Sequence, residues 1–137
     1  MKNKSRPPGV HFVYATAPTP RAARSLARLA VGRRLAACAN VLPEIDSLFW
    51  WGGKSEKAKE AGLILKTASD RIPELLRVLR EAHPYDCPCL VHWELAGGHP
   101  GFLRWVIAET RANALGTDQP RRRTCRTPRK ASSARSR

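Results

Sequence analysis

One short segment of the chain holds three side chains that can bind a transition metal: His83, Cys87 and Cys89. His83 precedes Pro84, where a helix is expected to end, and a neutral imidazole there can bind a borderline or soft metal ion. The alternative is a histidine that donates to the last carbonyls of the helix. Cys87 and Cys89 share one face of a predicted strand, and thiolates suit Cu(I) or Zn²⁺.

His92 and Glu94 occupy the opposite face of the same predicted strand and form a second, weaker pair of possible ligands. For both pairs the alternative is packing in a core or an interface. We expect no disulfide between Cys87 and Cys89, because side chains two residues apart in a strand stand about 6.5–7 Å from each other.

The segment RLAACANVLP, residues 34–43, places Cys38 in an apolar run. No neighbouring histidine or lysine would lower the pKa of its thiol, so we expect Cys38 to pack as a small hydrophobic residue. Asn40 points to the same side and needs a hydrogen-bonding partner if it is buried. A small polar cleft beside Cys38 and Asn40 would supply one.

Enzyme signatures are missing from the sequence. It has no G-x-S-x-G, no H-E-x-x-H and no phosphate loop. Gly52-Gly53 reads as a hairpin turn, because no helix follows directly. We therefore expect a protein that is not an enzyme and has no organic cofactor.

Most of the net charge of +14 comes from the two ends of the chain. Residues 1–9 and 120–137 carry 11 of the 25 basic residues and no acidic residue, so positions 10–119 have a net charge of only +3. The tail could contact nucleic acid non-specifically, but it lacks the aromatic residues that stack on bases. We expect no other nucleic-acid binding.

The length of 137 residues predicts one domain, and no apolar run is long enough to span a membrane. The four cysteines form no C-x-x-C pair, which favours a reduced, cytoplasmic protein without membrane contact. We expect basic, disordered ends at 1–9 and 117–137 and a folded domain at 10–116.

The first half of the domain is predicted as strand, helix and β-hairpin. A strand starts at His11, and Thr19-Pro20 begins a helix that runs to about Arg34. A long strand from Leu35 to Trp51 bends at Pro43-Glu44, and Ala61–Thr67 returns after the turn. The helix has a basic stripe that we expect to face solvent: Arg21, Arg24 and Arg28.

The second half is predicted as helix, strand and helix. Ser69 or Asp70 caps a helix that buries Ile72, Leu75, Leu76 and Leu79 and ends at His83. The last strand covers Cys87–Leu95, at a sheet edge because it contains Pro88. A third helix begins near His99-Pro100 and buries Phe102, Trp105 and Val106.

The order β-α-β-β-α-β-α predicts an α+β, ferredoxin-like (split βαβ) sandwich. Its four-stranded antiparallel sheet would carry two helices on one face, with an extra C-terminal helix. Phe49, Trp50 and Trp51 stand together at the hairpin tip, and three consecutive rings cannot all face one core. We expect them at a subunit interface; the alternative is a tip that folds back over its own sheet.

Five segments in order make the chain resemble the CutA family of divalent-cation tolerance proteins: AACANVLP, SLFWWGGK, LILKT, HPYD and GHPGFLRWV. The resemblance covers about residues 10–112. It implies a homotrimer with a role in the response to metal ions, chiefly copper, and no established reaction. The alternative is a PII-like signalling or scaffold trimer that binds a small molecule or a protein.

The resemblance also implies a cleft between subunits. Its lining would include Cys38, Asn40, Lys66, Tyr85 and Asp86, with His83 as a metal ligand. The chain departs from the family pattern at four positions. Ala15 and Ala82 stand where some members carry a thiol and a second histidine, Asp86 stands for glutamate, and Glu44 stands for glycine.

Overall fold

The computed structural model describes residues 7–111 of the chain. Residues 1–6 and the tail at 117–137 lie outside this range, and so does the non-specific contact with nucleic acid that the tail could make. The elements in order are β1 (Val10–Ala17), α1 (Pro20–Gly32), β2 (Cys38–Trp51), β3 (Lys54–Ala68), the 3₁₀ turn η1 (Ser69–Arg71), α2 (Ile72–Ala82), β4 (Leu90–Glu94) and α3 (Pro100–Arg111).

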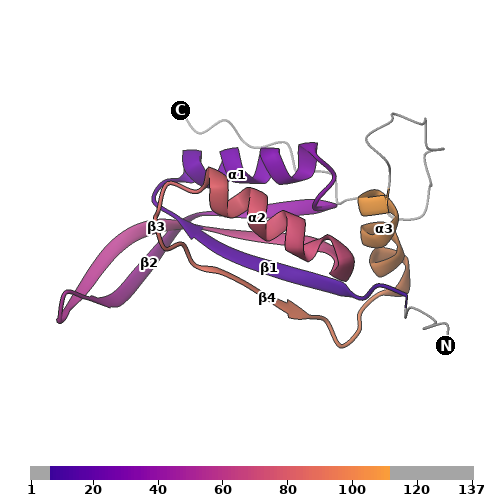
Figure 1. Ribbon diagram of the computed structural model, residues 1–137. Helices are drawn as coiled ribbons and strands as arrows, with labels where there is room; N and C mark the ends of the chain where they lie inside the picture. The colour runs from indigo at the N-terminus through magenta and orange to yellow at the C-terminus, as the bar shows by residue number, and fades with distance from the viewer. Residues whose placement is uncertain (1–6, 112–137) are drawn as a thin grey trace, which may run out of the picture.

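The four strands form one antiparallel sheet in the order β2-β3-β1-β4. Helices α1 and α2 lie side by side over one face of this sheet, and α3 lies beyond one end of it (Figure 1). The expected split βαβ sandwich with an additional C-terminal helix is thereby confirmed. β4 is an edge strand, as Pro88 predicted, although it begins only at Leu90.

Helix α1 begins where the sequence predicted. The side-chain oxygen of Thr19 accepts a hydrogen bond of 3.1 Å from the backbone N–H of Ala22, and Pro20 is the first helical residue. Its buried face consists of Ala23, Leu26 and Ala30, while the basic stripe Arg21, Arg24 and Arg28 is exposed, as expected.

The chain between α1 and β2 differs from the prediction. Arg34 adopts a positive φ of 56°, and the chain turns there instead of entering a strand. Leu35 and Ala36 then pack into the core, with only 2% of each residue exposed. Strand β2 consequently begins at Cys38 and not at Leu35.

Strands β2 and β3 form a long hairpin that projects past the rest of the sheet (Figure 1). Gly52 and Gly53 have φ angles of 57° and 78°, the left-handed values that a two-residue hairpin turn requires. The register shifts between Leu42 and Ile45, which confirms the bend at Pro43-Glu44. β3 starts at Lys54, seven residues before the predicted Ala61.

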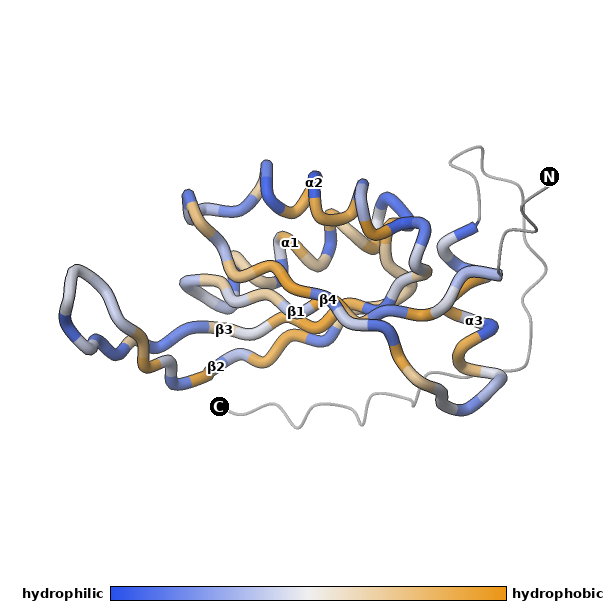
Figure 2. Tube along the Cα trace, turned by 60° about the horizontal axis from the view of Figure 1, so that its bottom comes forward, coloured by the Kyte–Doolittle hydropathy of each residue, from blue (hydrophilic) through white to orange (hydrophobic). Residues whose placement is uncertain are grey.

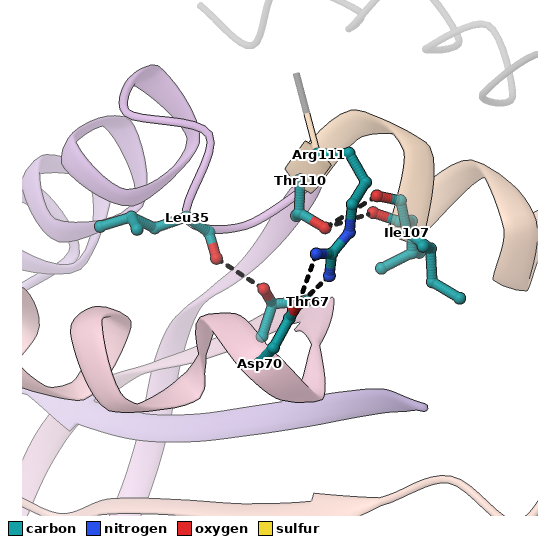
Figure 3. Close-up of polar contacts among 7 residues, drawn as sticks. Leu35, Thr67, Asp70, Ile107, Thr110 and Arg111 are labelled. Carbon is teal, nitrogen blue, oxygen red and sulfur yellow. Dashed lines mark hydrogen bonds and ion pairs between the residues drawn. The ribbon is translucent and has the colours of Figure 1, made fainter. Parts of the chain in front are cut away.

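Helix α2 has no side-chain cap, so the prediction that Ser69 or Asp70 caps it was wrong. Both residues belong to the preceding 3₁₀ turn. The carboxylate of Asp70 instead forms a bidentate ion pair with the guanidinium of Arg111 (Figure 3). This contact fastens the end of α3 to the start of α2. It also lowers the pKa of Asp70, through the hydrogen bonds from Arg111.

The core fills the space between the two helices and the sheet. It contains fully buried side chains from both layers, among them Val13, Leu63, Leu65, Leu75 and Leu79. The hydroxyl of Thr67 donates a hydrogen bond of 2.6 Å to the carbonyl oxygen of Leu35 (Figure 3), which satisfies a buried polar group beside this core.

Helix α3 buries less than the sequence predicted. Val106 and Thr110 are its buried residues, whereas Phe102 and Trp105 stay partly exposed. Their rings stack with centroids 6.0 Å apart. The reason is the position of α3 at the end of the sheet, where only one side of the helix meets β1 and β3.

Neither α1 nor α2 covers the opposite face of the sheet, although Lys66 on that face is only 7% exposed. The alternation along the paired strands assigns to this open face Phe12, Tyr14, Thr16, Cys38, Asn40, Leu42, Ile64, Lys66, Val91 and Trp93. Leu42, Val91 and Trp93 are large apolar residues that are 39%, 49% and 45% exposed. We use the name open face for this set of residues below.

Candidate functional site

His83 caps the C-terminus of α2, and both of its ring nitrogens are engaged. Nε2 lies 2.7 Å from the carbonyl oxygen of Thr16, and Nδ1 lies 3.0 Å from the backbone N–H of Tyr85. The carbonyl can only accept and the N–H can only donate, so the ring is the neutral tautomer with its proton on Nε2. His83 is 8% exposed, less than the sequence suggested.

Cys87 and Cys89 precede β4 instead of lying in it, so they do not share a strand face as predicted. Pro88 between them lacks the N–H that a strand would use, which accounts for the late start of β4. Both cysteines are free and exposed. Burial raises the pKa of the Cys89 thiol, and the nearby carboxylate of Glu60 raises it further.

Residues 7–111 contain no group of three or more His, Cys, Asp or Glu side chains that could hold a metal ion. His83, Cys87 and Cys89 therefore do not converge on a metal position within one chain. His92 and Glu94 lie in β4, on its other side from Val91 and Trp93.

Cys38 and Lys66 are direct partners across β2 and β3 on the open face. Burial raises the pKa of the Cys38 thiol and lowers the pKa of the Lys66 amine. The amine lies 5.6 Å from the centre of the Phe12 ring, a favourable arrangement for a cation. Asn40 is exposed on the same face.

Tyr85 and Asp86 lie elsewhere. The Tyr85 hydroxyl donates a hydrogen bond of 2.8 Å to a carboxylate oxygen of Glu60, and burial together with this bond raises the pKa of Tyr85 to about 12. Glu60 and Lys66 are six residues apart on β3, a distance of about 20 Å along a strand. The residues expected to line one cleft thus form two separate groups in a single chain.

The aromatic residues of the hairpin are exposed as expected for an interface. Phe49, Trp50 and Trp51 are 40%, 77% and 74% exposed, and Leu48 is 78% exposed. The apolar parts of the protruding hairpin are visible in the hydropathy colouring (Figure 2). The tip extends away from its own sheet and does not fold back over it.

Sequence reasoning missed one pair of histidines. His11 on β1 and His92 on β4 approach each other with their Nδ1 atoms 3.1 Å apart. The two residues are 81 positions apart, and only the register of β1 against β4 brings them together.

No helix in the described part of the chain is long and apolar enough to cross a membrane.

Comparison with known proteins gives a consistent result. The family model described as CutA1 divalent ion tolerance protein matches residues 11–109. The divalent-cation tolerance protein CutA of Pyrococcus horikoshii is 39% identical over 100 residues, which cover 73% of this chain and 97% of that protein. Protein CutA of Mus musculus is 35% identical over 116 residues, which cover 83% of this chain but only 65% of the mouse protein.

A solved structure supports the same assignment. The periplasmic divalent cation tolerance protein CutA from Archaeoglobus fulgidus has a TM-score of 0.71 and 35% identity, covering 74% of this chain and 98% of that one. The family model spans most of the chain, and the sheet order and hairpin match the expected fold. The chain is therefore a member of the CutA1 divalent ion tolerance protein family.

Proposed function

We propose that this protein acts in divalent-cation tolerance as a homotrimer and is not an enzyme. The main support for this proposal is the family match over residues 11–109, together with relatives that are named for divalent-cation tolerance. These names support tolerance and give no support to the alternative of a PII-like signalling trimer. The chain spans 65% of the length of the mouse relative and 97% of the length of the Pyrococcus horikoshii relative.

The trimer accounts for the apolar surface of the single chain. The open face presents Val91 and Trp93, and the hairpin presents Leu48, Trp50 and Trp51, all between 45% and 78% exposed. Surfaces of this kind are common at protein interfaces and rare on small monomers. Further copies that dock on the open face and on the hairpin would cover these residues.

The trimer also offers a route to the expected cleft. Cys38, Asn40 and Lys66 lie on the open face, whereas Tyr85 and Asp86 lie near the base of the hairpin. In one chain these two groups stand apart. Contacts between copies would let the first group of one subunit meet the second group of another.

Within this cleft we propose weak binding of copper or another divalent metal ion. Cys87 and Cys89 are the most accessible ligands, because both thiols are exposed and free. His83 would first have to give up its bonds to Thr16 and Tyr85. The ion would be the cargo or signal of the protein and not a resident cofactor.

We place this function in the cytoplasm. The support is the free state of Cys38, Cys87 and Cys89, which suits a reducing compartment. The Archaeoglobus fulgidus relative is named as periplasmic, so fractionation of the native cells is the direct measurement.

Complementation tests the function. A bacterial strain that lacks its own CutA gene is transformed with the full chain and grown in graded concentrations of copper, zinc and cobalt salts. We expect the chain to restore growth at concentrations that inhibit the vector control. Equal growth inhibition of both strains, with the protein present in soluble form, would refute the proposal.

Metal titration of the purified full chain tests the ligands. We expect Cys87→Ser and Cys89→Ser to weaken Zn²⁺ binding, because thiolates are preferred zinc ligands. Ser25→Ala is the control, since this exposed residue of α1 lies outside the cleft. If both cysteine variants bind Zn²⁺ like the wild type, the thiols are not ligands.

A further inference from the structure

His11 on β1 and His92 on the edge strand β4 form a pair that sequence reasoning missed. Their rings are inclined by 42°, with centroids 5.2 Å apart, and the two Nδ1 atoms are 3.1 Å apart, a distance at which one ring can donate a hydrogen bond to the other. His92 pairs with Val13, and His11 pairs with Glu94 and Thr67, so all of these residues are on the face that also carries α1 and α2.

We propose that His11 and His92 chelate a divalent transition-metal ion through their Nδ1 atoms. Imidazole nitrogens bind such ions at about 2.0–2.1 Å. Two nitrogens on one ion therefore stand about 2.8–3.4 Å apart at ligand angles of roughly 90–110°. The observed separation of 3.1 Å falls inside this range.

The surroundings of the histidine pair favour the binding of a cation from solvent. β4 is an edge strand and His92 is exposed, so an ion can approach from water. Glu94 lies opposite His11 on the same face and adds negative charge. Its carboxylate lies over Gly9, where a Cβ atom would come within 2.5 Å of Oε1, so it is not a ligand in this arrangement.

The remaining ligands would be water. Within residues 7–111 no third histidine, cysteine or carboxylate joins the pair to make a larger group. A two-histidine chelate of this kind prefers the ions that favour imidazole, namely Cu²⁺, Ni²⁺ and Zn²⁺. It would also fasten the five-residue strand β4 to β1, because one ligand comes from each strand.

This site is separate from the one proposed above. His11 and His92 lie on the helix-bearing face of the sheet, whereas the cleft residues Cys38 and Lys66 lie on the open face. Docking on the open face by itself therefore does not cover the pair. The inference rests on the two nitrogen positions and does not depend on a role in cation tolerance.

Isothermal titration with Ni²⁺ on the full chain tests the chelate, because Ni²⁺ binds imidazole without oxidising thiols. We expect His11→Gln and His92→Gln each to weaken binding at least tenfold. The double variant should lose no more than either single variant, since removal of one ligand already breaks the chelate. His99→Gln is the control and should bind Ni²⁺ like the wild type.

A second measurement covers the case in which His11→Gln folds poorly. Amide hydrogen exchange of Leu90–Glu94 should slow when Ni²⁺ is added to the wild type, and should not change in His92→Gln, which alters only an exposed edge residue. Unchanged Ni²⁺ affinity in His92→Gln, or an equal loss in His99→Gln, would overturn the inference. Loss of binding in Cys87→Ser alone would point to the thiol site of the proposed function instead.

Discussion

The imidazole of His83 links helix α2 to strand β1 through its bond of 2.7 Å to the carbonyl oxygen of Thr16. Its second nitrogen accepts the N–H of Tyr85, so the ring organises the turn that follows the helix. The main role of a histidine in this position is structural. A metal ion that binds His83 would have to replace two existing hydrogen bonds. Exposed side chains without such bonds, such as the thiols of Cys87 and Cys89, are therefore better placed as metal ligands.

Replacement of His83 by alanine should destabilise the protein. The change leaves the Thr16 carbonyl and the Tyr85 N–H without their partner, which costs about 1–3 kcal/mol of unfolding free energy. Urea unfolding measures it. The same loss should be found with and without EDTA. A loss that disappears in EDTA would show that His83 acts mainly as a metal ligand.

The ion pair between Asp70 and Arg111 should make a pH-dependent contribution to stability. The hydrogen bonds from Arg111 lower the pKa of Asp70 in the folded state, so the contribution is fully present above the ordinary aspartate pKa. It is lost as the pH falls through the lowered value. Both side chains are about half exposed, and the gain should stay below about 1 kcal/mol.

Asp70→Asn tests this ion pair by urea unfolding at pH 7 and at pH 2. We expect the variant to be less stable than the wild type at pH 7, and we expect this difference to shrink as the pH falls toward 2. Glu74→Gln is the control, because Glu74 pairs with Arg77 within one helix at 3.6 Å and links no two elements. A difference at pH 2 as large as at pH 7 would contradict the account.

Tyr85 should keep its proton to unusually high pH. Burial and the hydrogen bond to Glu60 raise the pKa of Tyr85 to about 12, above the usual value of about 10. The resulting stability is present below pH 10 and is lost as the pH rises through the folded value. Ultraviolet titration should show a late phenolate signal that Tyr85→Phe removes and Glu60→Gln moves to lower pH. A late signal that persists in Tyr85→Phe would belong to Tyr14.

Cys38 should react more slowly with iodoacetamide than Cys87. Burial raises the pKa of Cys38, which reduces its thiolate fraction, and the side chain is only partly accessible on the open face. Peptide mass spectrometry gives the rate at each site. Lys66→Met should slow Cys38 further, because the charge of Lys66 lowers the pKa of this thiol. Equal rates at Cys38 and Cys87 would show that Cys38 is a reactive group.

The hairpin tryptophans should contribute to association and not to the fold of one subunit. Trp50 and Trp51 are 77% and 74% exposed, so Trp50→Ser with Trp51→Ser should leave the secondary structure unchanged. The double variant should weaken the trimer at least tenfold. Lys57→Ser, on the same hairpin, is the control. Sedimentation velocity with circular dichroism measures both properties, and an unchanged trimer would place these rings outside the interface.

Local signals in the sequence predicted much of the fold. Thr19-Pro20 marked the start of α1, Gly52-Gly53 marked the hairpin turn, and Pro88 marked an edge strand. The errors arose where no local signal exists. Nothing in the sequence shows that Arg34 takes a positive φ, and Asp70 finds Arg111 only through a contact 41 positions away.

The candidate sites show the same difference: the local position of a residue was predicted, whereas its long-range contacts were not. His83 was correctly placed at the end of α2, but its bond to Thr16 depends on how that helix lies against β1. The pair of His11 and His92 depends on strand register, which a single sequence does not reveal. Whether Cys38 and Tyr85 share a cleft depends on contacts between copies, which lie beyond the geometry of one chain.

The central claim is that copies of this chain cover the open face and the exposed hairpin. Sedimentation equilibrium of the full chain at micromolar concentration tests it most directly. The account predicts a single species of three times the chain mass of 15.2 kDa. A stable species with the mass of one chain at the same concentration would contradict the trimer and the cleft that depends on it.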